Sequence, residues 1–96
     1  MYELRYMNAA ESYFKKLKDK GLKLMFRNAL ERMSVNPYEG EVKHGDLAGL
    51  YCYDVYYNKT NYEIAYRVYE ESNKTVAIIL AGTRENFYKE LKRHMK

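Results

Sequence analysis

Apolar residues recur at helical spacing in two stretches near the start of the chain. In the first, Asn8 and Glu11 resemble a capping box that opens a helix, and Gly21 is expected to end it. The second stretch is expected to end at Asn36-Pro37, because the residue before a proline avoids helical backbone. Its helical face is formed by Leu22, Met25, Phe26, Ala29, Leu30 and Met33. The pattern predicts a helical hairpin whose apolar stripes pack into the core.

Alternation of apolar and polar residues predicts strands on either side of this hairpin. Residues 2–6 alternate over a short run, residues 38–49 read as a loop, and residues 50–57 and 62–69 alternate again. One face of the later runs should carry Tyr51, Tyr53, Val55, Tyr57, Tyr62, Ile64, Tyr66 and Val68, and the other Cys52, Asp54, Glu63, Ala65 and Arg67. Residues 76–81 are wholly apolar, which predicts a central strand covered on both faces.

A last helix is expected after this strand, with Thr83 as its cap and Phe87, Tyr88 and Leu91 along one side. The fold class is therefore α+β, in the order β-α-α-β-β-β-α. A helical hairpin should pack on a mainly antiparallel four-stranded sheet, followed by a C-terminal helix. The 96 residues suffice for one domain, residues 1–96. The junction at residues 82–88, between buried strand and helix, is the expected working surface.

Composition narrows the functional classes. A single cysteine, Cys52, forms no internal disulfide and suits a reducing compartment, and it offers no metal-ligand spacing with His44 and His94. The chain shows no signal peptide and no apolar run that could span a membrane, so we expect a soluble cytoplasmic protein without a cofactor.

The net charge of +4 is unevenly distributed. Residues 1–36 carry +4, residues 37–82 carry −3 and residues 83–96 carry +3. Basic surfaces at the two ends can attract nucleic acid or an acidic protein segment, and they can equally be solvated lysine faces.

Four segments in this order carry a resemblance to a known family. They are Asn36-Pro37-Tyr38-Glu39-Gly40, Gly45-Asp46-Leu47-Ala48-Gly49-Leu50-Tyr51, Tyr62-Glu63-Ile64-Ala65-Tyr66-Arg67-Val68 and Gly82-Thr83-Arg84. Over nearly its whole length the chain resembles the RelE/ParE toxin superfamily. This implies a toxin of a bacterial toxin–antitoxin pair, neutralised by a cognate antitoxin segment that wraps it. RelE-like members cut messenger RNA in the ribosomal decoding site without metal, whereas ParE-like members poison DNA gyrase.

Metal-free RNA cleavage defines what the site needs: a proton acceptor for the 2′-hydroxyl, cations for the phosphorane and a donor for the leaving oxygen. The resemblance places a basic residue at Arg84, an aromatic at Tyr88 and, in one branch, a catalytic glutamate near Glu41. The same loop adds Lys43 and His44, whose imidazole has an unperturbed pKa near neutrality. Alternatively, Tyr88 packs on the sheet, Arg84 pairs with an acid and His44 is inert.

The chain departs from the RelE-like pattern on the outward face of the later strands. Cys52 and Asp54 stand where that branch carries basic residues, Glu63 stands where it carries a catalytic arginine, and Arg67 is the only base on this face. Two carboxylates about 5 Å from a substrate phosphate would oppose its binding. Either Glu63 or Asp54 accepts the proton while Arg84 and Lys43 act as cations, or the chain is not an efficient nuclease.

Three functional hypotheses follow. The leading one is a toxin-type ribonuclease that acts on mRNA bound to the ribosome. The second is a binding protein on the same fold, either a DNA gyrase inhibitor or a module that lost catalysis. The third is an antitoxin-dependent regulator without activity of its own.

Overall fold

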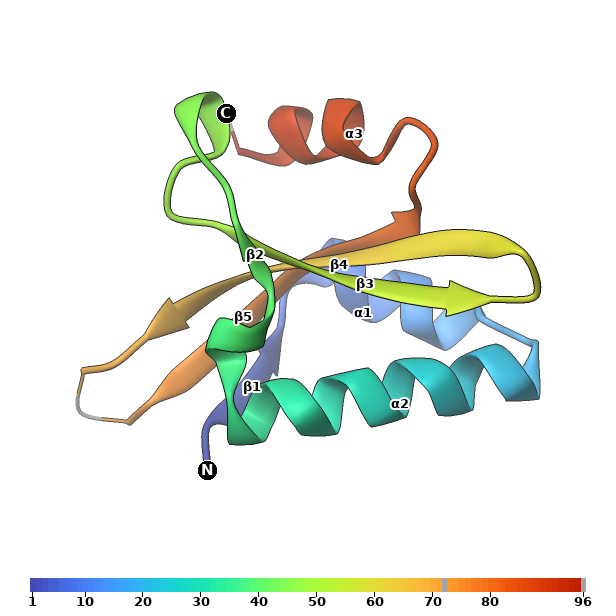
Figure 1. The fold of residues 1–96 in the computed structure, drawn as a ribbon, viewed down its shortest axis with the longest axis horizontal. Helices are drawn as coiled ribbons and strands as arrows, with labels where there is room; N and C mark the ends of the chain where they lie inside the picture. The colour runs from blue at the N-terminus through green and yellow to red at the C-terminus, as the bar shows by residue number, and fades with distance from the viewer. Residues whose placement is uncertain (72, 96) are drawn as a thin grey trace.

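The computed structural model describes residues 1–71 and 73–95 (Figure 1). Its elements in chain order are β1 (Glu3–Tyr6), α1 (Asn8–Lys16), α2 (Lys20–Val35), η1 (Pro37–Glu39), β2 (Glu41–Val42), η2 (Gly45–Leu47), β3 (Tyr51–Tyr57), β4 (Thr60–Tyr69), β5 (Thr75–Thr83) and α3 (Phe87–His94). The predicted α+β class and the order of its main elements are confirmed. The two-residue β2 is a fifth strand, inside the segment for which the sequence predicts only a loop.

The sheet has the order β1-β5-β4-β3-β2. β1 runs parallel to β5, with Glu3 beside Thr75, and the remaining neighbours are antiparallel. The apolar β5 is therefore a central strand, as its sequence predicts, and it joins the N-terminal strand to the rest of the sheet. None of the helices in the described ranges is long and apolar enough to cross a membrane.

An irregularity in β5 changes which way its side chains point. Ala65 pairs with Leu80 while the next residue, Tyr66, pairs with Ile78, so Ile79 is an extra residue in the ladder. Ile78 and Ala81 consequently belong to the core on one side of the sheet, whereas Ile79 and Leu80 both pack on the other side. The bulge lets one strand supply apolar side chains to both layers.

α1 and α2 cover one face of the sheet, which we call the hairpin face (Figure 1). The predicted facing set of β3 and β4 side chains is confirmed, since all of them pack into the core on this side. Phe26 of α2 is 1% exposed, and its ring lies 5.3–5.9 Å from those of Tyr13, Phe14 and Tyr62 in edge-to-face contacts. Each such pair adds about 0.5–1.5 kcal/mol beyond the apolar area it buries.

α3 and the segment of residues 43–50 cover the opposite face, which we call the outer face (Figure 1). Its apolar cluster is smaller and consists of Leu47, Leu50, Cys52, Ala65, Phe87 and Leu91. Lys92 of α3 lies 3.7 Å from Asp46 of the covering segment, although both side chains are largely exposed. Because fewer apolar side chains are buried in the outer layer, polar groups can also lie beneath α3.

The boundary between α1 and α2 differs from the prediction. Gly21 does not end a helix but lies in the first turn of α2, after a break at residues 17–19. Asp19 begins this helix by accepting hydrogen bonds from the backbone N–H groups of Gly21 and Leu22. A side chain at Gly21 would collide with the Tyr57 hydroxyl, so the glycine serves close packing and not termination. Asn8 is already helical and its side chain makes no cap, so the predicted capping box is wrong.

The start of α3 also differs from the prediction. β5 continues through Thr83, and the next residue, Arg84, donates its backbone N–H to the Asn61 carbonyl at 2.9 Å. Because this bond extends the pairing toward β4, Thr83 is not a helix cap. The chain turns at Asn86, which has left-handed backbone at φ 64°, and α3 begins at Phe87.

Candidate functional site

A polar cluster lies on the outer face where β5 leads into α3. Glu63 of β4 pairs in register with Gly82, so no β5 side chain stands beside it on this face. The space is taken by Arg84 from the turn and by Tyr88 from the first turn of α3. The strand end, the turn and the helix thus bring together three residues that the sequence singles out as candidates.

Glu63 is the buried centre of this cluster, with only 1% of its surface exposed. Tyr88 donates its hydroxyl to Glu63 Oε1 at 2.8 Å, and Arg84 Nε lies 3.1 Å from Oε2. The Arg84 N–H does not point along a hydrogen bond, so Oε2 accepts none from the described residues and has only a charge contact. Burial raises the pKa of Glu63, Tyr88 opposes the shift, the neighbouring Asp54 adds to it, and Arg84 opposes it.

A second charged pair adjoins the first. Lys43 Nζ lies 4.8 Å above the centre of the Tyr88 ring and 2.6 Å from Glu41 Oε1. Burial lowers the pKa of Lys43, but its bonds to Glu41 and Tyr88 outweigh burial and raise it overall. The bond from Lys43 in turn lowers the pKa of Glu41, so this pair is fully ionised at neutral pH.

The two neutral groups in the cluster are poor acids. Burial, together with the bond to Glu63, raises the pKa of Tyr88 to about 12. Burial is also the main reason that the pKa of Cys52 rises to about 11. At neutral pH, Tyr88 therefore acts as a hydroxyl donor that holds position, and Cys52 is an apolar thiol inside the outer cluster.

The structure brings five of the seven predicted site residues together: Glu41, Lys43, Glu63, Arg84 and Tyr88. His44 is exposed next to this cluster, and its charge contributes to lowering the pKa of Glu41. Arg67 lies apart, since it follows Glu63 by four residues along β4, or about 13 Å. Arg67 instead faces Gly49, where an added Cβ would lie 2.9 Å from its Nη1.

Some features of the site have little or no signal in the sequence. The contact between Lys43 and Tyr88 joins segments that are far apart in the chain and depends on the path of residues 43–50. The burial of Glu63 depends on α3 lying across the sheet. The sequence indicates this only in part, through the apolar side of α3 and the alternation that places Glu63 on the outer face of β4. Within the described residues, no three His, Cys, Asp or Glu side chains form a group that could hold a metal ion.

Comparison with protein families gives a match across the fold just described. The family described as ParE-like toxin of type II bacterial toxin-antitoxin system matches residues 4–92. A comparison with curated proteins gives no match.

Solved toxin structures share the fold. The toxin–antitoxin complex RelBE2 from Mycobacterium tuberculosis contains a chain 26% identical to this one, with a TM-score of 0.66, and the match covers 86% of this chain and 98% of that one. A chain of the intact E. coli RelBE complex is 20% identical with a TM-score of 0.65, covering 85% and 95%. An E. coli RelE mutant with two arginines changed to alanine, in the free state, is 18% identical with a TM-score of 0.70, covering 96% of each chain.

Proposed function

The chain belongs to the ParE-like toxin family of type II bacterial toxin–antitoxin systems, and because it shares its fold with RelE we propose that it cleaves ribosome-bound messenger RNA without metal. A cognate antitoxin neutralises it, as the RelBE complexes contain toxin and antitoxin together. Its substrate would then be mRNA and its partner the ribosome, both in the cytoplasm.

One observation carries the proposal: Glu63 holds Arg84 in place, yet much of the Arg84 side chain remains exposed to a substrate. Its contact with buried Glu63 is made through Nε, while 58% of the side chain remains exposed. The two terminal nitrogens of the guanidinium are then available to bind a phosphate in its usual forked geometry. Lys43 lies over the Tyr88 ring and adds a second positive charge near Arg84.

The roles of the other candidate residues follow from how exposed their side chains are. Glu63 is too buried for a substrate to reach, so it positions Arg84 and Tyr88 and does not accept the 2′-hydroxyl proton. The exposed groups that can accept this proton are Glu41 and His44, next to Lys43, and Asp54, which pairs in register with Glu63. Of these, Glu41 is a weak base, because bonding to Lys43 lowers its pKa. Arg67 would contact RNA farther along the strand.

Arg84→Ala tests the proposal most directly. Expression of the wild-type chain in bacteria should arrest growth, and mapping of RNA ends should show cuts within codons. Arg84→Ala should lower the cleavage rate by about 10²–10³, the usual loss when one group that stabilises developing negative charge is removed. Arg93→Ala is the matched control, because this exposed α3 arginine pairs with Glu90 away from the cluster. Unchanged cleavage in Arg84→Ala would refute the assignment.

The balance of charge in the cluster favours a second candidate function. Lys43 is paired with Glu41 and Arg84 with Glu63, so these four groups together carry no net charge to attract RNA. A protein that inhibits DNA gyrase, or binds another partner, needs no such attraction. Arrested cells with intact messages and a DNA-damage response would point to gyrase. No arrest at all would contradict both toxin functions.

A further inference from the structure

A pocket separate from the polar cluster lies on the outer face, between the start of α1 and the end of α3. It encloses about 410 Å³, within the range of about 300–1,000 Å³ that is usual for small-molecule sites. The sheet forms its floor through Tyr69, Ala77 and Ile79. Residues 7–9 form one wall and residues 94–95 form the other. The pocket is therefore built from four elements of the fold.

Two arginines stand on either side of this floor. Arg5 of β1 and Arg67 of β4 both pair in register with Ala77, so the three side chains form a row on the outer face. The strands that carry the arginines lie about 10 Å apart, and the small Ala77 leaves space between them. Arg5 has an exposed contact with Glu3 at 3.7 Å, which holds it weakly. The row is thus a place where a compact anion can meet two cations.

The other polar groups of the pocket also suit an anion. The described part of the chain places no carboxylate within 4.0 Å of Arg67, which lines the pocket. Arg67 is half-buried against Gly49, so its guanidinium loses less freedom when it binds a ligand. His94 and Asn8 add exposed polar side chains at the two walls, and the lining contains no Asp or Glu.

The rest of the lining favours an aromatic group beside the anion. Tyr69 is 50% exposed, so its ring is open to stacking. Met7 and Met95 stand on opposite walls, and methionine sulfur makes favourable contacts with aromatic rings. Together with the two arginines, this lining fits a flat ring that carries a strongly charged anionic group.

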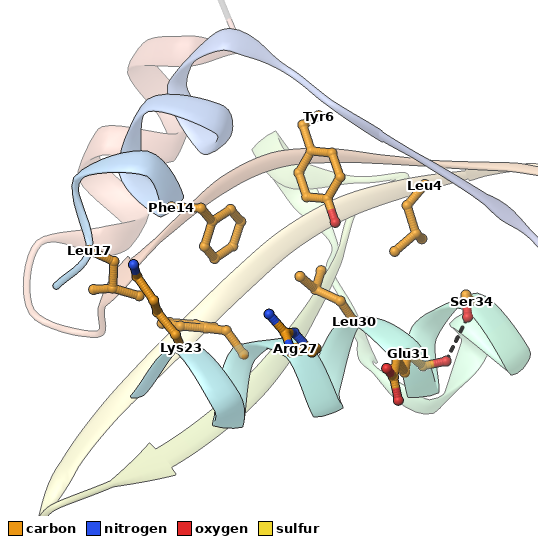
Figure 2. A pocket seen from close by; sticks show the side chains of 10 residues that line it. Leu4, Tyr6, Phe14, Leu17, Lys23, Arg27, Leu30, Glu31 and Ser34 are labelled. Carbon is orange, nitrogen blue, oxygen red and sulfur yellow. Dashed lines mark hydrogen bonds between the residues drawn. The ribbon is translucent and has the colours of Figure 1, made fainter. Parts of the chain in front are cut away.

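The groove on the hairpin face, between β1, α1 and α2, differs in its charges (Figure 2). Its cations Lys23 and Arg27 share α2 with Glu31, which lies one turn beyond Arg27. Ser34 donates its hydroxyl to the Glu31 carbonyl at 2.7 Å at the same end of the groove. Since cations and a carboxylate share this groove, Arg27 is a suitable control for an arginine outside the outer-face pocket.

The geometry points to a binding site for a nucleotide that carries a 5′-phosphate. The base stacks on Tyr69 between the two methionines, and the phosphate binds the forked guanidinium of Arg67 with Arg5 beyond Ala77. A phosphate monoester carries about −1.5 to −2 charges at neutral pH, which suits two arginines better than an internal RNA phosphate does. The ligand is a free mononucleotide or the 5′-phosphorylated end of an RNA. The site itself does not depend on the proposed cleavage.

Titration with adenosine 5′-monophosphate, followed by nuclear magnetic resonance, tests the site. The mononucleotide should bind at least about tenfold more tightly than adenosine or inorganic phosphate alone. Arg67→Ala should weaken its binding about tenfold and leave adenosine binding unchanged, whereas Tyr69→Ala should weaken both. Arg27→Ala should bind like the wild type. Thermal unfolding checks that each variant folds.

A 5′-phosphorylated tetra-adenylate distinguishes the two sources of the ligand. Tighter binding than the mononucleotide identifies the RNA end, and equal or weaker binding identifies the free mononucleotide. If the wild-type chain binds the mononucleotide as described but does not cleave RNA, the proposed function fails and the site stands. If it cleaves RNA but binds no mononucleotide, the site fails and the proposed function stands.

The same spectra locate the ligand on the wild-type chain without any substitution. The backbone amides of residues 7–9, Ala77 and residues 94–95 should shift, whereas those of Arg84 and Tyr88 should not. Shifts centred on Arg84 would place the nucleotide in the polar cluster and overturn the inference. Equal affinities for adenosine and its monophosphate, or unchanged binding in folded Arg67→Ala, would overturn it as well.

Discussion

The hairpin face is closed by interlocking aromatic rings, whereas the outer face is closed by a short helix lying over a buried carboxylate. On the hairpin face even a deeply buried hydroxyl is satisfied, since Tyr66 donates to the Pro37 carbonyl at 2.7 Å. On the outer face Glu63 Oε2 is buried without a hydrogen bond from the described residues. The contrast indicates that one layer supplies stability while the other retains the charges that the proposed cleavage would require.

Phe26→Ala should cause the largest loss of stability and test the contrast most severely. Removing a ring that touches three others should lower the free energy of unfolding by about 3–5 kcal/mol. Phe87→Ala on the outer face should cost less, because Phe87 contacts one ring, Tyr88, in a smaller cluster. Urea unfolding measures both. Equal losses would show that the two layers contribute alike.

Gly40→Ala should cause the next largest loss of stability, because the packing around this glycine on the hairpin face is tight. The added methyl group would collide with the buried Tyr66 hydroxyl and lie 3.0 Å from the Cys52 carbonyl oxygen, costing about 1–3 kcal/mol. Gly21→Ala meets only Tyr57, whose ring must shift and strain its hydrogen bond to Asp19, and this cost is offset by about 0.5–1 kcal/mol of helix propensity. Thermal unfolding should therefore leave Gly21→Ala near the wild type; the reverse order would contradict the packing described.

Glu63→Gln should change the free energy of unfolding by about 1 kcal/mol at neutral pH, less than Phe26→Ala or Gly40→Ala. The change is small because glutamine can still accept the hydrogen bond from the Tyr88 hydroxyl. The variant should be distinguished by how its stability depends on pH. Burial raises the pKa of Glu63 above the ordinary 4.5, so the folded state holds the proton more tightly. The wild type therefore loses stability as pH rises from about 4.5 through the folded-state pKa, whereas the glutamine variant lacks this loss.

Urea unfolding at a series of pH values measures that difference. The stability of Glu63→Gln relative to the wild type should improve as pH rises across this interval. Glu85→Gln is the control, since Glu85 is exposed in the adjacent turn. Parallel curves for the wild type and Glu63→Gln would mean that Glu63 is not held in a site that disfavours its charge, and the outer face would lose its distinguishing feature.

Periodicity predicts the hairpin, the later strands and the facing sets of β3 and β4, because these depend on local alternation. It does not predict β2, the extra residue Ile79 or the position of Gly21 inside α2. Each of these depends on a neighbour distant in sequence: the pairing of Glu41 with Cys52, the register against Ala65, and the Tyr57 hydroxyl.

The site was predictable to a similar extent. Alternation places Glu63 and Cys52 on one face, and the end of β5 points to Arg84. The distance of Arg67 from the cluster follows from four residues of strand and was available from the sequence. The anchoring of Tyr88 and Arg84 by Glu63 was not, because it requires α3 to lie across β4.

The parallel pairing of β1 with β5 also bears on how the chain folds. The two strands lie about 70 residues apart in sequence, so their contact closes a long loop and is expected to form after the more local β3–β4 and β4–β5 pairs. The central strand and Arg84 both come from the last quarter of the chain. During synthesis, the sheet and its polar cluster are thus completed together, only after β5 and the turn that carries Arg84 have been made.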